Sequence, residues 1–330
     1  MELTPPNFLL QAEALERRIV ENHRRMQDVK SKIRILRSGY NGEKTIKYYL
    51  EQIPEHKYHI FYGLRLPIGN TYFQIDTLLL SKKLILILDA KNHSGTLRFE
   101  KNQLIHEHAG NRDVYENPVA QVNRHKILLR HLFEKNKIPP IPIGNFVTVC
   151  KPSTEIIINQ GYQEAAQKVI RAYDILKKID ELEERYTEKK LNQKTFNQVI
   201  NLLKTQHTPQ KIDILNFFQI TEDELITGVQ CPRCSYIPMD YKRSKWICNA
   251  CILFSKDAHL NGINDYFLLI KSSFSNPEIR TFLHLPSSRS TTSFLPKLNF
   301  PHTGTKRGRI YHQPTFPFFT NHVFPPKNKQ

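Results

Sequence analysis

The sequence predicts an α/β protein whose mixed sheet is followed by a helical region, a metal-binding ribbon and a basic C-terminal segment. Two observations carry this prediction. A helical pattern precedes three strand-like segments, and a second helix precedes a fourth strand, giving the order α-β-β-β-α-β. Two Cys-x-x-Cys pairs then lie beyond this region of regular secondary structure. We therefore expect an α/β domain and a separate metal-stabilised part.

Charge and hydropathy narrow the class of protein. The chain has 330 residues, enough for about two domains of ~150 residues each. Lys and Arg number 48 against 31 Asp and Glu, a net charge of +17 that favours polyanionic partners such as nucleic acid. The longest aliphatic run, residues 84–88, is far shorter than the ~20 residues of a membrane span. The N-terminus has no basic region followed by an apolar stretch, so we expect a cytoplasmic protein without a membrane partner.

The first element is a helix predicted over residues 8–37. Apolar residues recur at helical spacing from Leu15 to Leu36, and the other faces carry more bases than acids. Packing of the apolar face on the next domain is the simpler interpretation. A DNA-tracking or coiled-coil arm is the alternative.

The α/β elements follow without a break. The first helix is expected over 42–52, and Asn117-Pro118 opens a second one that runs to Phe133. Gly69-Asn70 and Ser81-Lys82 mark the connections between the first strands. The predicted strands are 58–66, 72–81, 83–91, 96–100, 103–108 and 144–150.

Two acids and a lysine lie on neighbouring predicted strands. Strand 72–81 alternates, so Asp76 shares one face with its alternate neighbours. Strand 83–91 is apolar on both faces and ends in Asp89-Ala90-Lys91, whose two charged residues share a face. If the strands form a hairpin, Asp76 and Asp89 converge, and two carboxylates suit Mg²⁺. Lys91 would then orient a water molecule, and Glu43 on the first helix would complete the site.

These residues resemble the nuclease-related domain (NERD) of the PD-(D/E)xK nucleases. The matching words are Gly39-x-x-Gly42-Glu43, Phe73-Gln74-Ile75-Asp76, Asp89-Ala90-Lys91-Asn92 with Gly95, and Asn117-Pro118-x-x-Gln121. The resemblance covers residues 39–155 and implies a restriction-endonuclease-like fold with Mg²⁺- or Mn²⁺-dependent phosphodiester hydrolysis. It assigns metal binding to Asp76 and Asp89, with Glu43 as a third acid, and water positioning to Lys91. Gln121 matches a glutamine that supports the site. His125, one turn further on, is interpreted as a helix-surface residue.

A purely structural alternative exists for the same side chains. Lys91 could pair with Asp76 or Asp89 and cap the end of the sheet, because clusters of perturbed acids are sometimes structural. This alternative predicts no metal dependence.

The four paired cysteines predict a structural zinc site. Cys231 and Cys234 form one pair, Cys248 and Cys251 the other, and residues 235–247 between them fit the hairpin of a zinc ribbon. Four thiolates leave no open coordination position, so we expect Zn²⁺ to hold the fold. Cys150, in an apolar strand, is expected in the core.

The last part of the chain is basic and resembles a winged helix. The pattern predicts a short helix over 276–283, a turn at Leu285-Pro286 and a second helix over 287–298 that carries Arg289. Pro296 should shorten this second helix. A glycine-bent hairpin follows with Lys306, Arg307 and Arg309. We expect these four bases to bind nucleic acid, a solvated basic loop being the alternative.

Six regions make up the predicted organisation. They are the N-terminal helix (1–38), the NERD-like domain (39–155), a helical connecting region (156–226), the four-cysteine zinc ribbon (227–256), the winged-helix-like segment (257–312) and a disordered tail (313–330). The sequence favours a Mg²⁺-dependent nuclease that acts on DNA in processing or defence, with RNA left open. The alternative is a DNA-binding or scaffold protein whose nuclease-like core does not cut.

Overall fold

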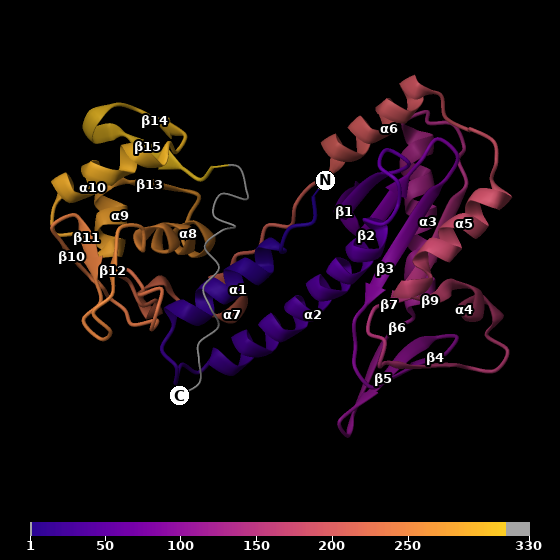
Figure 1. Ribbon diagram of the computed structural model, residues 1–330, viewed down its shortest axis with the longest axis horizontal. Helices are drawn as coiled ribbons and strands as arrows, with labels where there is room; N and C mark the ends of the chain where they lie inside the picture. The colour runs from indigo at the N-terminus through magenta and orange to yellow at the C-terminus, as the bar shows by residue number, and fades with distance from the viewer. Residues whose placement is uncertain (1, 315–330) are drawn as a thin grey trace. The chain divides into compact units, whose positions relative to one another are not determined.

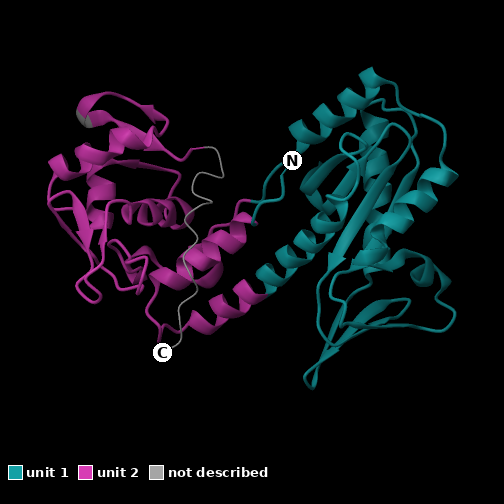
Figure 2. Ribbon diagram, viewed as in Figure 1, with its two compact units in different colours: residues 1–5, 35–210 teal, residues 6–34, 211–330 magenta. Residues whose placement is uncertain are grey.

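The computed structural model describes residues 2–314, apart from the side chain of Arg307, and forms two compact units (Figure 2). Unit 1 comprises residues 1–5 and 35–210, and unit 2 comprises residues 6–34 and 211–330. The tail expected from residue 313 falls almost entirely outside the described residues.

Unit 1 is built on a five-stranded mixed sheet, here called sheet A. Its strand order is β1-β2-β3-β7-β9, antiparallel from β1 to β3 and parallel from β3 to β9 (Figure 1). The strands are β1 (His59–Ile68), β2 (Thr71–Leu80), β3 (Ile85–Lys91), β7 (Ile143–Val149) and β9 (Val169–Arg171). Strand β3 lies in the centre and is buried from Ile85 to Asp89, as expected for an aliphatic run in a central strand.

Helices cover both faces of sheet A. On one face, α3 (Pro118–Lys135) and α6 (Gln193–Gln206) share a core with the first three strands. On the other, α2 (Met26–Leu50) and α5 (Ile175–Arg185) pack on the alternate side chains of the same strands. The predicted order α-β-β-β-α-β is confirmed from α2 to β7, and the two apolar faces fix the register of β2 and β3.

A second sheet, sheet B, follows β3 in the chain. Its order is β6-β5-β4-β8, and its apolar side chains pack with residues of α3 and β7. The strands are β4 (Thr96–Phe99), β5 (Gln103–His108), β6 (Asn111–Glu116) and β8 (Glu155–Ile158). A short helix, α4 (Gln163–Lys168), precedes β9.

The N-terminal segment differs from the single helix predicted over 8–37. It forms α1 (Asn7–Arg18), which ends at Ile19 in extended conformation, and then the continuous α2, which absorbs the helix expected at 42–52. Arg18 explains the break, because its backbone carbonyl accepts from Ile226 and its side chain is bound within unit 2. Helix α1 packs on other helices of unit 2, whereas the simpler interpretation expected it on the domain that follows it in the chain.

The region expected to be a helical connection, 156–226, divides differently in the structure. Residues up to 210 belong to unit 1 and supply β9, α5 and α6. Only the remainder, with α7 (Ile214–Phe218), belongs to unit 2. Strand β9 thereby extends sheet A beyond the expected boundary at 155.

Unit 2 combines a small ribbon with helices and a second three-stranded sheet, here called the winged-helix part after the prediction for residues 257–312. The ribbon is the antiparallel sheet β10 (Asp240–Lys242), β11 (Lys245–Ile247) and β12 (Phe254–Ser255). After it come α8 (His259–Leu269), β13 (Ser273–Ser275), α9 (Asn276–Leu283), α10 (Ser288–Phe294), β14 (His302–Thr303) and β15 (Ile310–His312). The helix pair α9–α10 and the hairpin β14–β15 agree with the prediction, and α10 ends before Pro296 as expected.

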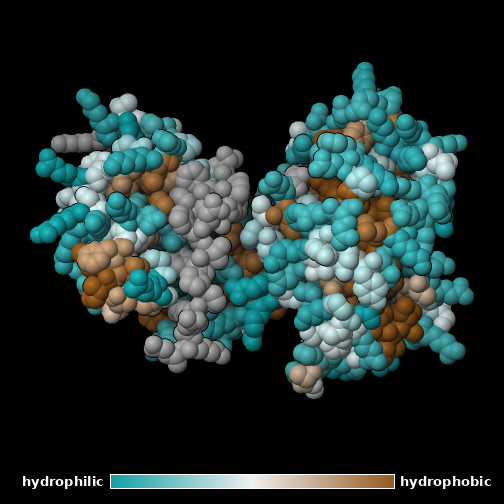
Figure 3. Space-filling view, viewed as in Figure 1, coloured by the Kyte–Doolittle hydropathy of each residue, from teal (hydrophilic) through white to brown (hydrophobic). Residues whose placement is uncertain are grey.

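One core joins the two parts of unit 2. Trp246 of the ribbon and Phe274 and Leu283 of the winged-helix part are buried in the same cluster. Trp246 Nε1 donates to Nδ1 of the buried His259 at 3.1 Å. Helix α1 adds a buried ion pair between Arg18 Nε and Asp265 Oδ2, which are 2.8 Å apart. On the surface, hydrophilic side chains lie between apolar patches (Figure 3).

No helix in the described part of the chain is long and apolar enough to cross a membrane.

Candidate active site and candidate metal centre

The hairpin of β2 and β3 places two acids opposite each other. The last paired residues are Thr77 and Leu88, so the next position outward sets Asp76 against Asp89. Asp89 is buried, and Asp76 Oδ2 accepts a hydrogen bond from the backbone N–H of Ala90 at 3.0 Å. The strand register therefore brings the two expected acids together.

Helix α2 supplies the third acid through a close approach. A Cβ on Gly42 would lie 3.0 Å from Asn92 Cβ and 3.3 Å from Ala90 Cβ, so glycine allows the helix to contact the end of β3. Glu43 follows directly and interacts electrostatically with Asp76. Gly42 thus sets the position of Glu43 beside the strand ends.

Lys91 is held between the acids and α3. Its Nζ lies 2.8 Å from Asp89 Oδ2 and donates to Gln121 Oε1 at 3.3 Å. Helix α3 begins at a fixed point because the Asn117 side chain caps it, accepting from the backbone N–H groups of the first turn. This cap places Gln121 one turn later, within reach of Lys91.

The electrostatics of the site are those of crowded carboxyl groups. Burial, then the charge of Asp76, raises the pKa of Glu43 to about 8. Burial, then Asp89, raises the pKa of Asp76 to about 6, against the opposing effects of Lys91 and the Ala90 N–H. Burial opposes the charge on Lys91, but Asp89 and Asp76 outweigh it and raise the pKa of the ammonium. A divalent cation would offset this excess of negative charge, so the donor set fits Mg²⁺ or Mn²⁺.

The family scan identifies this part of the chain. Residues 38–150 match the family model described as the nuclease-related domain. They form a nuclease-related domain. No curated protein and no solved structure matches the chain.

The nuclease-related domain extends from the middle of α2 past the end of β7, and contains Glu43, Asp76, Asp89, Lys91 and Gln121. The match confirms the resemblance and the restriction-endonuclease-like fold that it implies. Unit 2 and the last strand of sheet A, β9, lie outside the match.

Two further residues of the domain, His125 and Cys150, are buried. His125 was expected on the helix surface, but it is buried, its ring centroid 6.0 Å from that of Phe73. Burial lowers the pKa of His125, and Asp89 and Lys91 are among the charges that act on it. The sequence prediction for His125 is therefore wrong, because α3 turns this face toward the sheet. Cys150 is buried, as expected for a core residue.

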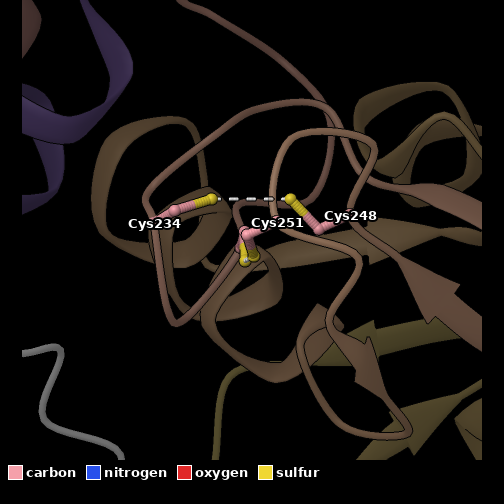
Figure 4. Close-up of side chains that lie close together, drawn as sticks. Cys234, Cys248 and Cys251 are labelled. Atoms are coloured by element: carbon pink, nitrogen blue, oxygen red, sulfur yellow. Dashed lines mark hydrogen bonds between the residues drawn. The ribbon is translucent and has the colours of Figure 1, made fainter.

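The second candidate centre is formed by the four cysteines of unit 2. Their Sγ atoms all lie within 4.8 Å of one another. Figure 4 shows the side chains of Cys234 and Cys248 pointing toward each other, with Cys251 beside them. Cys231 Sγ lies 3.6 Å from Cys251 Sγ, and Cys234 Sγ lies 3.5 Å from Cys248 Sγ. Burial would raise the pKa of Cys248, but the N–H groups of Cys251 and Ala250 lower it to about 7. This donor set fits a structural metal such as Zn²⁺.

Within residues 2–314, these cysteines are the one set of three or more His, Cys, Asp or Glu whose ligand atoms cluster this tightly. Glu43, Asp76 and Asp89 are spread more widely. Direct binding of one cation by all three acids would therefore require side-chain movement.

The expected nucleic-acid-binding bases lie in the winged-helix part of unit 2. Arg289 on α10 and Lys306 before β15 are exposed, whereas Arg309 is half-buried. The side chain of Arg307 is outside the described residues. The structure thus places two of the four bases on the surface and does not bring them into contact with one another.

Proposed function

We propose that this protein is a cytoplasmic, Mg²⁺- or Mn²⁺-dependent nuclease that hydrolyses phosphodiester bonds of DNA. The observation that carries the proposal is the convergence of Asp76, Asp89 and Lys91, with Glu43 beside Asp76, inside a nuclease-related domain. A positive net charge of +17 supports a polyanionic substrate.

Asp76 and Asp89 would hold the cation, with Glu43 as a third acid. When bound, such a cation polarises a phosphate oxygen and lowers the pKa of a bound water molecule. The acids supply the negative charge that selects a hard divalent ion over a monovalent one. Asp89 is buried on β3 and Asp76 accepts from the Ala90 N–H, so these two acids are held in place, which lowers the reorganisation needed during the reaction.

Lys91 has the positioning role in this proposal. Asp89 and Gln121 hold its ammonium from two sides, so Nζ points to a defined place at the strand end. From there it donates a hydrogen bond to the attacking water and balances negative charge that develops on the phosphate. Gln121 orients the lysine and is itself a positioning residue.

Unit 2 would bind DNA on behalf of the nuclease-related domain. Structural Zn²⁺ at Cys231, Cys234, Cys248 and Cys251 would stabilise the ribbon. Arg289, Lys306, Arg307 and Arg309 would then contact phosphates from α10 and the hairpin. These contacts would contribute to the affinity for DNA and take no part in the cleavage reaction.

The proposal is tested with purified wild type, Asp89→Ala and Lys91→Ala. Each is incubated with supercoiled and linear, single- and double-stranded DNA in Mg²⁺, Mn²⁺ or a chelator. We expect metal-dependent cleavage by wild type and a loss of about 10³-fold or more in both variants, with DNA binding largely unchanged. Equal cleavage by all three proteins would reject the assignment of the site.

An outcome without cleavage favours the scaffold alternative. If wild type shifts DNA in a salt-sensitive manner but releases no product in either metal, the core is a binding platform. A parallel series with RNA of the same sequence decides the sugar.

A further inference from the structure

Three basic positions follow the carboxyl edge of the parallel part of sheet A. The register pairs Lys91 with Val149 and Val149 with Arg171 across β3, β7 and β9. Paired residues of a parallel sheet lie side by side, so Arg171 is on the face of Lys91, two strands or about 10 Å away. Lys151 follows β7 by two residues and lies between them at the same edge.

Hydrogen bonds hold these two additional bases at the edge. Lys151 Nζ donates to Ser94 Oγ, on the segment that leaves β3. Arg171 donates through one guanidinium nitrogen to the carbonyls of Lys151, at 3.3 Å, and Pro152, at 3.2 Å. Both residues are half-buried. The two bases are therefore positioned by the fold on either side of one turn.

Neither base has an acidic partner in the described part of the chain. Many other bases of unit 1 do, such as Lys178 with Glu181 and Lys190 with Glu188. Two positioned bases without a carboxylate within 4.0 Å, continuing in line from Lys91, form a site for anions. Regular placement across adjacent strands fits the successive phosphates of one chain better than a single small anion.

Three side-chain rings, those of His93, His106 and Tyr115, lie near Ser94 on the segment that leaves β3. His106 Nε2 donates to the Ser94 carbonyl at 2.7 Å, and the His106 ring centroid lies 4.7 Å from that of His93. The Tyr115 ring centroid lies 5.8 Å from that of His93, and Tyr115 is 44 % exposed on β6, the outer strand of sheet B. Bases beside exposed rings are the combination that binds unpaired nucleic acid, phosphates on the cations and bases on the rings.

We infer that Lys151 and Arg171 bind phosphates of an unpaired DNA strand that flanks the scissile bond, and that Tyr115 stacks on a base of that strand. The inference rests on the proposed function and adds the substrate class: DNA that is single-stranded on one side of the cut. None of the three residues touches the reacting atoms in this arrangement.

The experiment separates binding from cleavage. All proteins carry Asp89→Ala, so no substrate is cut, and affinity for a fluorescent single-stranded oligonucleotide is measured by anisotropy over a range of salt without divalent cations. We expect Lys151→Ala with Arg171→Gln to weaken binding and to lower the slope of log K against log salt by about 1.4, since each phosphate contact on a single strand contributes about 0.7. We expect Tyr115→Ala to weaken binding of single strands by about fivefold or more and of duplex much less.

A matched pair of variants controls for net charge. Lys178→Ala with Lys190→Gln removes the same charge from two bases of unit 1 that are paired with acids, and should leave the slope unchanged. Lys151→Arg with Arg171→Lys keeps the charge and should keep the slope, which shows that the edge tolerates substitution. Equal slopes for the double variant Lys151→Ala with Arg171→Gln and for the control Lys178→Ala with Lys190→Gln would overturn the inference. Because cleavage plays no part, inactivity of the wild type would reject the proposed function while leaving this result standing.

Discussion

The two units use charged side chains in opposite ways. Unit 1 crowds Glu43, Asp76 and Asp89 at a sheet edge, so that two of them have raised pKa values. Unit 2 buries Arg18 with Asp265 and two backbone carbonyls, so that the buried charge has partners. The first arrangement costs stability and fits a site that binds a cation, whereas the second holds helix α1 in place. The crowded acids of unit 1 are therefore interpreted as a binding site, and the buried ion pair of unit 2 as a structural contact.

Loss of metal from the cysteines should produce the largest difference between the units. Cys248→Ser removes one thiolate, and structural zinc sites contribute on the order of 10 kcal/mol to folding. Trp246, the single tryptophan of the chain, is buried in the core of unit 2 and reports on that unit alone. We expect its emission to shift to the red in the variant, while hydrogen exchange shows β3 of unit 1 still protected.

The control for this variant is Cys150→Ser, which changes a buried cysteine of unit 1. Its tryptophan emission should match that of the wild type. Loss of protection in both units after Cys248→Ser would show that they do not fold separately.

Removal of Arg18 should have the next largest effect. Arg18→Met leaves Asp265 with one partner fewer and two carbonyls without their donor, which costs about 3–5 kcal/mol. Arg17→Met, which also removes a contact to Asp265 but from a partly exposed side chain, should cost much less. Urea unfolding followed by tryptophan emission measures both, and equal losses would contradict the assignment of Arg18 as the buried partner.

Acid should destabilise unit 2 through His259. Burial lowers the pKa of His259 to about 4 from its ordinary value of 6.5. The unfolded chain therefore binds a proton that the folded unit does not, and stability falls as the pH drops from 6.5 to 4, by about 3 kcal/mol in total. Acid also releases metal from thiolates, so the test compares the thermal midpoints of wild type and His259→Gln at each pH. Parallel curves for the two proteins would contradict the prediction.

The smallest predicted effect concerns the fit of α2 against β3. Gly42→Ala would bring a Cβ to 3.0 Å from Asn92, so the helix and Glu43 must shift. We expect cleavage to fall by about 10- to 100-fold with little change in global stability. Gly39→Ala, on the same helix with nothing within 4 Å, should keep full cleavage and gain up to about 1 kcal/mol. Equal cleavage by the two variants would show that the approach of α2 does not position the site.

Local pattern predicted the parts of unit 1 that are fixed by pairing. The alternation of β2, the aliphatic run of β3 and the short turn between them determine the register that sets Asp76 against Asp89. The fold class is confirmed, and so is the resemblance of residues 38–150 to the nuclease-related domain. The catalytic and metal-binding roles of these residues stay predictions, since the structure reports position and charge.

Features that depend on distant partners were not predictable from local pattern. The break after Arg18 depends on Asp265, which lies 247 residues away along the chain. Strand β9 has three residues, and β6 is exposed along its length, so neither shows the alternation that marks a strand. The burial of His125 depends on how α3 is rotated about its axis against the sheet. Helical spacing alone does not determine that rotation closely enough to decide whether His125 faces the sheet or the solvent.

The composition of unit 2 from segments on both sides of unit 1 has a consequence for synthesis. Helix α1 is made before residues 35–210 of unit 1, but its partners Ile226, Gly228 and Asp265 leave the ribosome only after the whole of unit 1. The nuclease-related domain can therefore fold while α1 is still without its binding surface, and a chain interrupted after residue 210 would expose the apolar face of α1 to solvent. Synthesis thus completes the part with the candidate catalytic residues before the part that closes around α1.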